Sequence, residues 1–345
     1  MKLYPYSLAL FTLLLYVTNV CDVTAQAPFK VLAVKGQVKI ESRQAAIGQQ
    51  VKAADKISIA GSAYISMAHV NGRTVEIRKS GTYKVSDLDK AARKKSGSAT
   101  SKFAAYVLNE LTEVKEPISF TTTRRSHMNT TGSVDRIEGE DVDVADSILA
   151  MVGGPGELQA LAAVQSAAIK KGTVPTVIMP RHTRLLGDSI EFTWHGMSLG
   201  STYRLVVVDA NNNNVHMRTT SDTSVAAGAD GLGMQKGVVY YWHVEQANDA
   251  SIKTDEYALL IVDGNERVRA NELISEIAED TESDTTAIGQ LILASAFEDL
   301  GMNYEAYRAY SRAIALAPDV QNYKRMYAEF LTRQGLNLEA FIAYR

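Results

Sequence analysis

The C-terminal part of the chain contains the repeat that decides its fold: 294-ASAFEDLGMNYEAYRAYSRAIALAP-318 is followed by 328-AEFLTRQGLNLEAFIAY-344. Small residues, glycine and tyrosine recur at a spacing of 34 residues. Alanines such as Ala294 and Ala306 allow two helices to approach closely, and Gly301 suits the turn between them. A repeat of this length cannot bury its apolar face alone, so we expect the two copies to stack as helical hairpins.

The repeat resembles the tetratricopeptide repeat, although Gln290 stands where that family has an early tryptophan. The signature positions are Ala294, Gly301, Ala306, Tyr310, Ala313, Pro318, Ala328, Gly335, Ala340 and Tyr344. The resemblance implies a concave groove that binds another protein. Its expected lining is Leu291, Ser295, Glu298, Asp299, Arg325, Glu329 and Arg333. We assign residues 264–345 to this region, with the segment from Asn265 to Ala278 capping one side and the other edge completed by a partner or by further chain.

Residues 28–90 form short alternating runs broken by glycine, which predict a small all-β unit. Asn71-Gly72 between two such runs predicts a hairpin, because these residues accept the positive φ angles of a tight turn. The order of these features resembles the FecR-like domain, although Ala54-Asp55 departs from its usual acidic residue and glycine. Membrane-bound members signal through a cytoplasmic segment, and only Met1-Lys2 precedes the apolar run here, so we do not expect that role.

Residues 174–263 return to a β pattern, with predicted strands over 189–194, 203–208, 238–244 and 257–262. The strands carry large aromatic residues, and Trp194 and Trp242 occupy positions that suggest a two-sheet core. This order resembles a fibronectin type III or immunoglobulin-like sandwich. We expect no disulfide in it, because the only cysteine of the chain is Cys21.

Residues 91–173 are expected to form a helical connector with linkers. A basic, Ser/Gly-rich stretch precedes a predicted helix with Phe103, Val107, Leu108 and Leu111 on one side. Residues 135–146 are strongly acidic, and further helices are predicted on both sides of the break at 153–156. We interpret the charged stretches as solvated linkers.

The chain begins with Met1-Lys2 and an apolar run over 3–20, followed by small residues that end in Ala25. This pattern is typical of a secretory signal peptide, so we expect residues 1–25 to be removed. One alternative is an uncleaved anchor, although the run is shorter than the roughly 20 residues of a spanning helix. The other is a bacterial lipoprotein modified at Cys21. After cleavage we expect no membrane span.

Composition and short motifs limit the classes of function that the chain can have. The 345 residues carry a net charge of -3, which gives no general attraction to nucleic acid. The six histidines lack metal-ligand spacing, and we expect His243 on a half-exposed strand. The Asn run after Asp209 predicts a turn rather than a calcium loop. Ser189 opens a strand rather than a nucleophile turn. We therefore expect no catalytic residue, metal or cofactor.

These features together predict a multidomain protein: an all-β FecR-like unit, a helical connector, a β-sandwich and C-terminal helical repeats. The expected function is that of an exported, non-enzymatic scaffold or adaptor of a bacterial cell envelope, which binds another envelope protein through the repeats. Its expected location is the periplasm or the cell exterior, with outer-membrane association as a variant. The alternative is an envelope protein whose sandwich binds polysaccharide or peptidoglycan; fold resemblance alone does not decide between them.

The signal peptide gives a first prediction. We expect the exported protein to begin at Gln26, as measured by intact mass spectrometry. Ala25→Leu places a large side chain where processing requires a small one, so the precursor should accumulate. Ala27→Leu, beyond the cut, should be processed normally. An exported chain that retains residues 1–25, or that begins at Cys21, would contradict this prediction.

Overall fold

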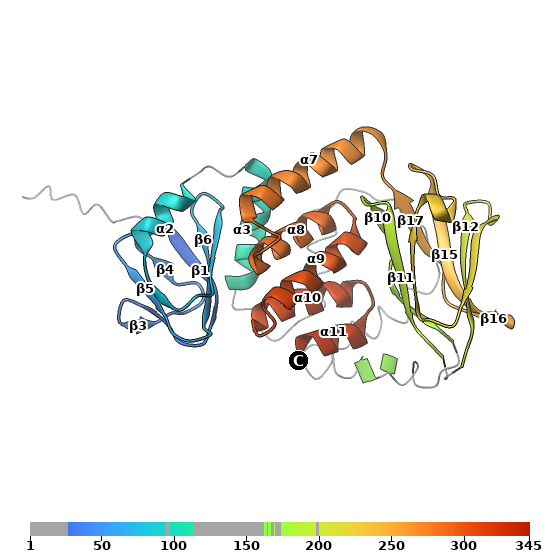
Figure 1. Cartoon of the computed structure of the whole chain (residues 1–345), viewed down its shortest axis with the longest axis horizontal. Coiled ribbons are helices and arrows are strands. Elements are labelled where there is room, and N and C mark those ends of the chain that lie inside the picture. Colours follow the sequence, from blue (N-terminus) through green and yellow to red (C-terminus); the bar gives the residue numbers. More distant parts are fainter. Residues whose placement is uncertain are drawn as a thin grey trace, which may run out of the picture.

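The computed structural model describes residues 27–93, 97–112 and 174–345 apart from 198–199, and also 162, 163, 165, 166 and 169. The predicted signal peptide, Cys21 and the acidic stretch lie outside the described residues. Two β regions flank a layer of helices in the described part (Figure 1). The coarse prediction of a multidomain chain with β regions and C-terminal helices is therefore confirmed.

The N-terminal unit consists of two four-stranded sheets with the orders β4-β1-β6-β7 and β3-β2-β5-β8. Its elements are β1 (Phe29–Lys35), β2 (Val38–Ile40), β3 (Arg43–Gln44), β4 (Gln50–Val51), β5 (Lys56–Ile59), β6 (Tyr64–His69), β7 (Thr74–Ile77), β8 (Gly81–Lys84) and α2 (Val85–Ala92). The predicted hairpin is confirmed, because β6 and β7 pair antiparallel and Gly72 in their turn has φ of 91°. Val31, Ile57 and Met67 are fully buried in the interior of the unit.

The last strand of the N-terminal unit is short. The alternation of Tyr83, Lys84 and Val85 is typical of a strand, but β8 ends at Lys84 and α2 follows at once. Val85, Leu88 and Ala92 have helical spacing, and α2 places this face on the core of the N-terminal unit. Burial of that face therefore outweighs the short alternating pattern.

The second β region has a three-stranded sheet in the order β14-β11-β9 and a larger sheet in the order β10-β17-β15-β12-β13, with β16 paired to β15. Its strands are β9 (Thr176–Met179), β10 (Thr183–Leu185), β11 (Ser189–His195), β12 (Tyr203–Asp209), β13 (Asn214–Thr220), β14 (Ser224–Gly228), β15 (Val239–Gln246), β16 (Asp249–Lys253) and β17 (Tyr257–Ile261), with a 3-10 turn at Asp230–Leu232. Both tryptophans are buried as expected, and the rings of Phe192 and Trp242 lie 4.6 Å apart.

The helical layer combines the repeats with a helix from the predicted connector. Its helices are α3 (Ser98–Thr112), α7 (Gly264–Thr281), α8 (Ala287–Asp299), α9 (Asn303–Leu316), α10 (Gln321–Arg333) and α11 (Asn337–Tyr344). The two hairpins α8–α9 and α10–α11 keep the 34-residue spacing of the sequence. Gly301 and Gly335 occupy their turns with φ of 69° and 72°, where a residue with a side chain would be strained.

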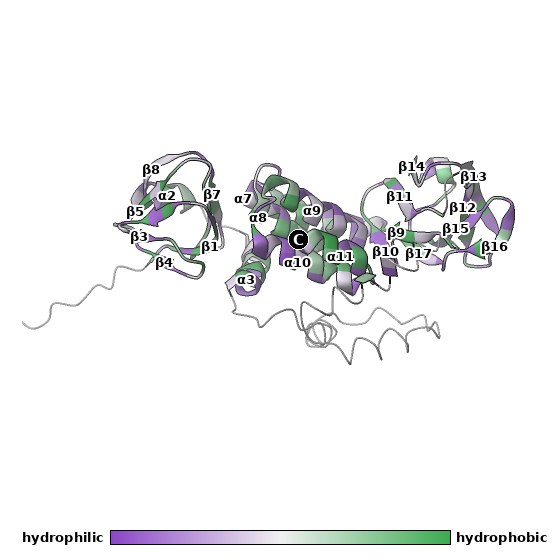
Figure 2. Ribbon diagram, turned by 90° about the horizontal axis from the view of Figure 1, so that it is seen from below, coloured by the Kyte–Doolittle hydropathy of each residue, from purple (hydrophilic) through white to green (hydrophobic). Residues whose placement is uncertain are grey.

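Helix α3 confirms the predicted helix, with Phe103, Val107 and Leu111 buried and Leu108 only partly buried. It packs against α7, α8 and α10 and against β1. One cluster of buried apolar residues runs from the N-terminal unit through α3 and the repeats into the sandwich. A second view shows the helical layer between the two β regions (Figure 2). The modules therefore pack against one another through this shared apolar cluster.

A buried polar contact joins α2 to the hairpin of the N-terminal unit. His69 Nε2 lies 3.0 Å from Asp89 Oδ1, and Arg93 donates to Asp89 Oδ2 at 2.7 Å. Both His69 and Asp89 are buried. The hydrogen bonds from Arg93 and His69 hold the pKa of the Asp89 carboxyl below its usual value of 3.8. The ionised form of Asp89 therefore stabilises the folded state.

We expect Asp89→Asn to lower the free energy of unfolding at neutral pH by about 1–3 kcal/mol, because it weakens the hydrogen bonds that the buried Asp89 carboxylate makes with buried His69 and with Arg93. Since the folded pKa is depressed, this contribution is present above pH 3.8 and is lost as the pH falls through the folded value. Urea unfolding as a function of pH should show the wild type and variant converging in acid. Asp87→Asn, exposed on the same helix, should leave stability unchanged; an equal loss there would contradict a specific role for Asp89.

Candidate functional site

The seven residues predicted to line the groove lie on one face formed by α8 and α10. Leu291, Ser295 and Glu329 are buried, and Asp299 is exposed at the rim. Positions 291, 295 and 299 on α8 have equivalents 34 residues later on α10, so the two helices present matching rows. The structure therefore brings together the residues that the sequence predicted as a partner site.

This face is covered by α3 of the same chain. Phe103, Val107 and Leu111 of α3 belong to the apolar cluster that contains Leu291 and the other buried side chains of α8 and α10. At the rim, Lys102 Nζ lies 3.2 Å from Asp299 Oδ2. The occupant of the predicted groove is thus a helix of the chain itself, about 180 to 230 positions earlier in the sequence. The sequence predicted the apolar side of α3 and the groove residues of α8 and α10, but it did not predict that these two surfaces pack against each other.

Polar side chains of α10 recognise the C-terminal end of α3. The last carbonyls of any helix lack partners within the helix. Here Arg325 donates to the carbonyl oxygen of Glu110 at 2.5 Å, and Asn322 Nδ2 donates to that of Leu111 at 3.1 Å. A cation at this end also favours the helix dipole. The α8–α10 face therefore contacts both the apolar stripe of α3 and the carbonyl groups of its last turn.

A second polar group lies deeper under α3. Arg333 donates to Glu298 Oε2 at 2.7 Å, and the hydroxyl of Tyr310 donates to Glu298 Oε1 at 2.7 Å. Burial raises the pKa of Tyr106 on α3, and the Glu110 and Glu298 carboxylates raise it further. Three signature or groove positions thus form one charged network against which α3 rests.

The fit between α3 and its surroundings leaves polar atoms without partners. Thr100 on α3 is fully buried, and its hydroxyl has no hydrogen-bond partner among the described residues. The Arg325 Nε atom is likewise buried without an acceptor within the described part, although it lies 3.8 Å from Glu329 Oε1. Each such group costs free energy, because its hydration is lost and not replaced.

Other faces of the helical layer hold the β regions. Glu76 of β7 accepts from the backbone nitrogen of Ile288 at the start of α8, at 2.7 Å, and the hydroxyls of Tyr64 and Tyr323 lie 3.0 Å apart. A carboxylate at a helix N-terminus is favoured by the helix dipole. The N-terminal unit is therefore fixed to the same helices, α8 and α10, that α3 covers.

The sandwich binds the turns of the two hairpins. The backbone nitrogen of Arg184 donates to the carbonyl of Gly301 at 3.0 Å, and Arg181 donates to the carbonyl of Gln334 at 2.7 Å. Glu305 on α9 accepts from the backbone nitrogen of Leu186 at 2.7 Å, and burial raises the pKa of its carboxyl. The turns of both hairpins thus serve as docking points for the sandwich.

The remaining signature residues lie where close helix packing needs them. Ala294, Ala306, Ala313, Ala328 and Ala340 are fully buried. Tyr310 stacks on Phe330 with ring centroids 5.0 Å apart. Pro318 is exposed just after α9, and Tyr344 ends α11 half-buried. Gln290, in place of the tryptophan, donates to the carbonyl of Ser283 at 2.9 Å.

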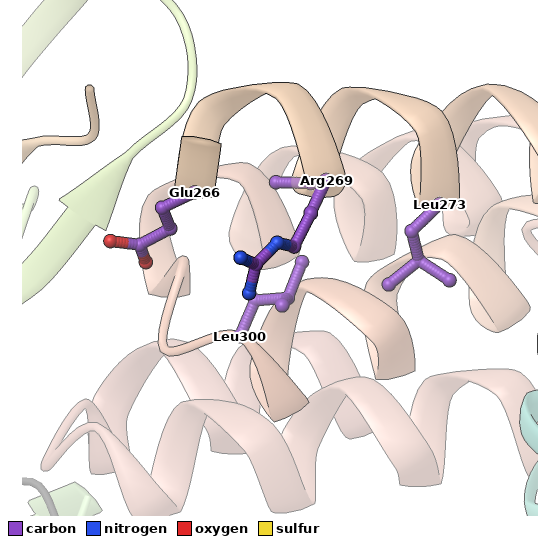
Figure 3. A pocket seen from close by; sticks show the side chains of 5 residues that line it. Glu266, Arg269, Leu273 and Leu300 are labelled. Carbon is purple, nitrogen blue, oxygen red and sulfur yellow. The ribbon is translucent and has the colours of Figure 1, made fainter. Parts of the chain in front are cut away.

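An open hollow of about 410 Å³ lies between α7 and the turn after α8. Figure 3 shows the Arg269 guanidinium beside Leu300, with Leu273 further along α7. Glu266 at its edge pairs with Arg184 of the sandwich. The hollow therefore offers a small apolar floor and one cation, without a set of groups arranged for acid–base or nucleophilic chemistry.

The loop after Asp209 folds on itself. Asp209 Oδ1 accepts from the backbone nitrogens of Asn211 and Asn213, both at 2.9 Å, and Asn212 has φ of 63°. These hydrogen bonds lower the pKa of the Asp209 carboxyl, those from Asn213 most strongly. The predicted turn is confirmed, and its carboxylate is engaged by the turn itself.

The prediction for His243 was wrong. Its side chain is buried in the sandwich, with Nε2 3.6 Å from Glu245 Oε2, and burial together with Lys253 lowers its pKa. The strand alternation placed it outward, but neighbouring side chains cover that face. Ser189 opens β11 opposite Gly228, as expected of a strand residue.

The described residues contain no cluster of three or more His, Cys, Asp or Glu side chains positioned to hold a metal ion. None of the helices in the described ranges has the length and apolar character needed to cross a membrane. No protein-family model matches the chain, and no curated protein matches it significantly. Function is therefore inferred from the geometry of the chain itself.

The unpaired hydroxyl of Thr100 gives a stability prediction. Thr100→Val keeps the shape of the side chain and removes the buried hydroxyl, so we expect the free energy of unfolding to rise by about 1 kcal/mol. Thr112→Val on the same helix should lower it, because Thr112 Oγ1 donates to Leu108 O at 2.8 Å and accepts from Lys30. Chemical denaturation of both variants checks the opposite signs; a loss of stability in Thr100→Val would contradict the assignment.

Proposed function

We propose that this chain is an exported, non-enzymatic adaptor of a bacterial cell envelope that binds a protein partner through its helical repeats. The observation that carries the proposal is the α8–α10 face. It accommodates an amphipathic helix, α3, through an apolar stripe and through side chains that cap the end of that helix. A face that binds one helix has the chemistry to bind another.

We further propose that the helical hairpins are tetratricopeptide repeats, that the second β region is a fibronectin type III or immunoglobulin-like sandwich, and that the N-terminal unit is FecR-like. The kept 34-residue spacing supports the first assignment. The two sheet orders, β14-β11-β9 and β10-β17-β15-β12-β13, support the second. The turn glycines Gly36 and Gly48, both with positive φ, support the third.

The glycan-binding alternative finds less support. Carbohydrate recognition by a sandwich depends on exposed aromatic rings, which stack on sugars. Trp194 and Trp242 are at most 2% exposed and pack within the core of the sandwich. The contacts of the sandwich with the hairpin turns instead suit a structural part that supports the repeats.

Site-specific photo-crosslinking in the envelope of the native host tests the adaptor proposal. A photoreactive phenylalanine at Asp299, exposed at the rim of the α8–α10 face, should yield one discrete protein adduct. An internal link to α3 leaves the molecular mass unchanged and is easily recognised. The same residue at Met217, which is 49% exposed on β13 of the sandwich, serves as the matched control and should yield none.

Two results would contradict this function. One is the absence of any protein adduct at position 299 in cells that export the folded protein. The other is an adduct only at position 217, which would move the binding site to the sandwich.

A further inference from the structure

The face under α3 combines the buried apolar side chains of α8 and α10 with charged groups. Of the seven predicted groove residues, only Leu291 is apolar, and five are acidic or basic. The side chains of Arg325, Glu329 and Arg333 are at most 19% exposed beneath α3. Burying charged groups is costly even when they pair, and a well-packed apolar face would hold a fixed helix at lower cost. Such a face is suited to a site that selects which helix it binds.

The bound helix is also imperfectly matched to this site. Thr100 Oγ1 is buried without a hydrogen-bond partner within the described part of the chain. A helix with an apolar residue at the Thr100 position would avoid this loss. Because α3 is attached to the chain, its effective concentration at the site is high, and this compensates for an imperfect fit. A separate ligand would need a better fit than α3 to compete with it.

We propose that α3 is a displaceable ligand built into the chain, and that the partner presents an amphipathic helix of the same pattern, which replaces α3 on the α8–α10 face. This inference rests on the proposed adaptor function and adds the class of the partner and a means of control. With α3 bound, the site is closed to partners; displacement opens it. Affinity for the partner is then set by the fraction of molecules in which α3 has left.

The contacts of α3 define the partner helix. It carries apolar residues at the positions of Phe103, Val107 and Leu111, a spacing of four residues that forms one stripe. A basic residue one position before the first of them pairs with Asp299, as Lys102 does. Its last turn ends at Arg325 and Asn322, which donate to its free carbonyls. An apolar residue replaces Thr100.

The attachments of α3 restrict how it leaves. Only residues 93–97 separate α3 from α2 of the N-terminal unit, and Lys30 of β1 donates to Thr112 at 3.3 Å. The Gly72 turn also lies against Ser101, where an added Cβ would come within 2.8 Å of its hydroxyl. Displacement therefore either breaks these contacts or moves the N-terminal unit together with α3.

Binding of a labelled peptide to the full chain tests the inference. The probe is the sequence 97-GSATSKFAAYVLNELT-112, measured by fluorescence anisotropy. Val107→Asp in the chain places a charge at a fully buried position and should expel α3. We expect the peptide to bind this variant about tenfold or more tightly than the wild type, because the competing helix is gone.

Ala105→Asp adds the same charge at an exposed position of the same helix, and should bind the peptide as weakly as the wild type. Val107→Ala, which weakens α3 without adding a charge, should improve binding about threefold or more and keeps the test valid if Val107→Asp does not fold. A peptide with Thr100→Val should bind the opened chain more tightly than the natural sequence.

The outcomes separate this inference from the adaptor function. Equal peptide binding by all folded chain variants would show that α3 is a permanent structural helix, and would overturn the inference. The crosslinking result at position 299 would not be affected by that outcome. Tight binding by the Val107 variants, without any protein adduct at position 299 in cells, would instead support a helix-binding site and contradict the adaptor function.

Discussion

The packing of α3 on α8 and α10 is the contact on which the rest of the arrangement depends. It places Phe103 and Leu111 in the same apolar cluster as the repeats, and joins a segment near residue 100 to one near residue 325. Two short hairpins have little interior of their own, and repeats of this kind usually need about three units to be stable. Helices α3 and α7 supply the missing neighbours, so the repeats are stabilised by their own chain.

Polar contacts then determine how the β regions are attached. Glu76 accepts from the first turn of α8, while the Arg184 backbone nitrogen and the Arg181 side chain of the sandwich donate to the turns at Gly301 and Gln334. Helix ends are the places where backbone groups lack partners, so they provide directional docking points for both regions. The ends of the repeat helices thus bind the two β regions, while their α8–α10 face is covered by α3.

Local structure could largely be predicted from the sequence. The hairpin at Asn71-Gly72, the buried Trp242 and the turn at Gly301 each depend on the conformational preference or apolar pattern of a few neighbouring residues. The errors arose where distant groups decide burial. Val85 begins a helix because its face meets the core of the N-terminal unit, and His243 is buried beside Glu245 of its own strand and Glu256 of the loop before β17.

The candidate site divides in the same way. The sequence by itself determined the 34-residue repeat and the apolar stripe of α3, because both are periodic patterns along the chain, and the resemblance to tetratricopeptide repeats supplied the seven groove residues. Only the tertiary structure decided that this stripe covers that groove. A helical pattern indicates that a face will be buried, but it carries no information about which surface buries it. Because some 200 residues lie between α3 and α10, the packing of these two helices follows from shape, charge and chain connection alone.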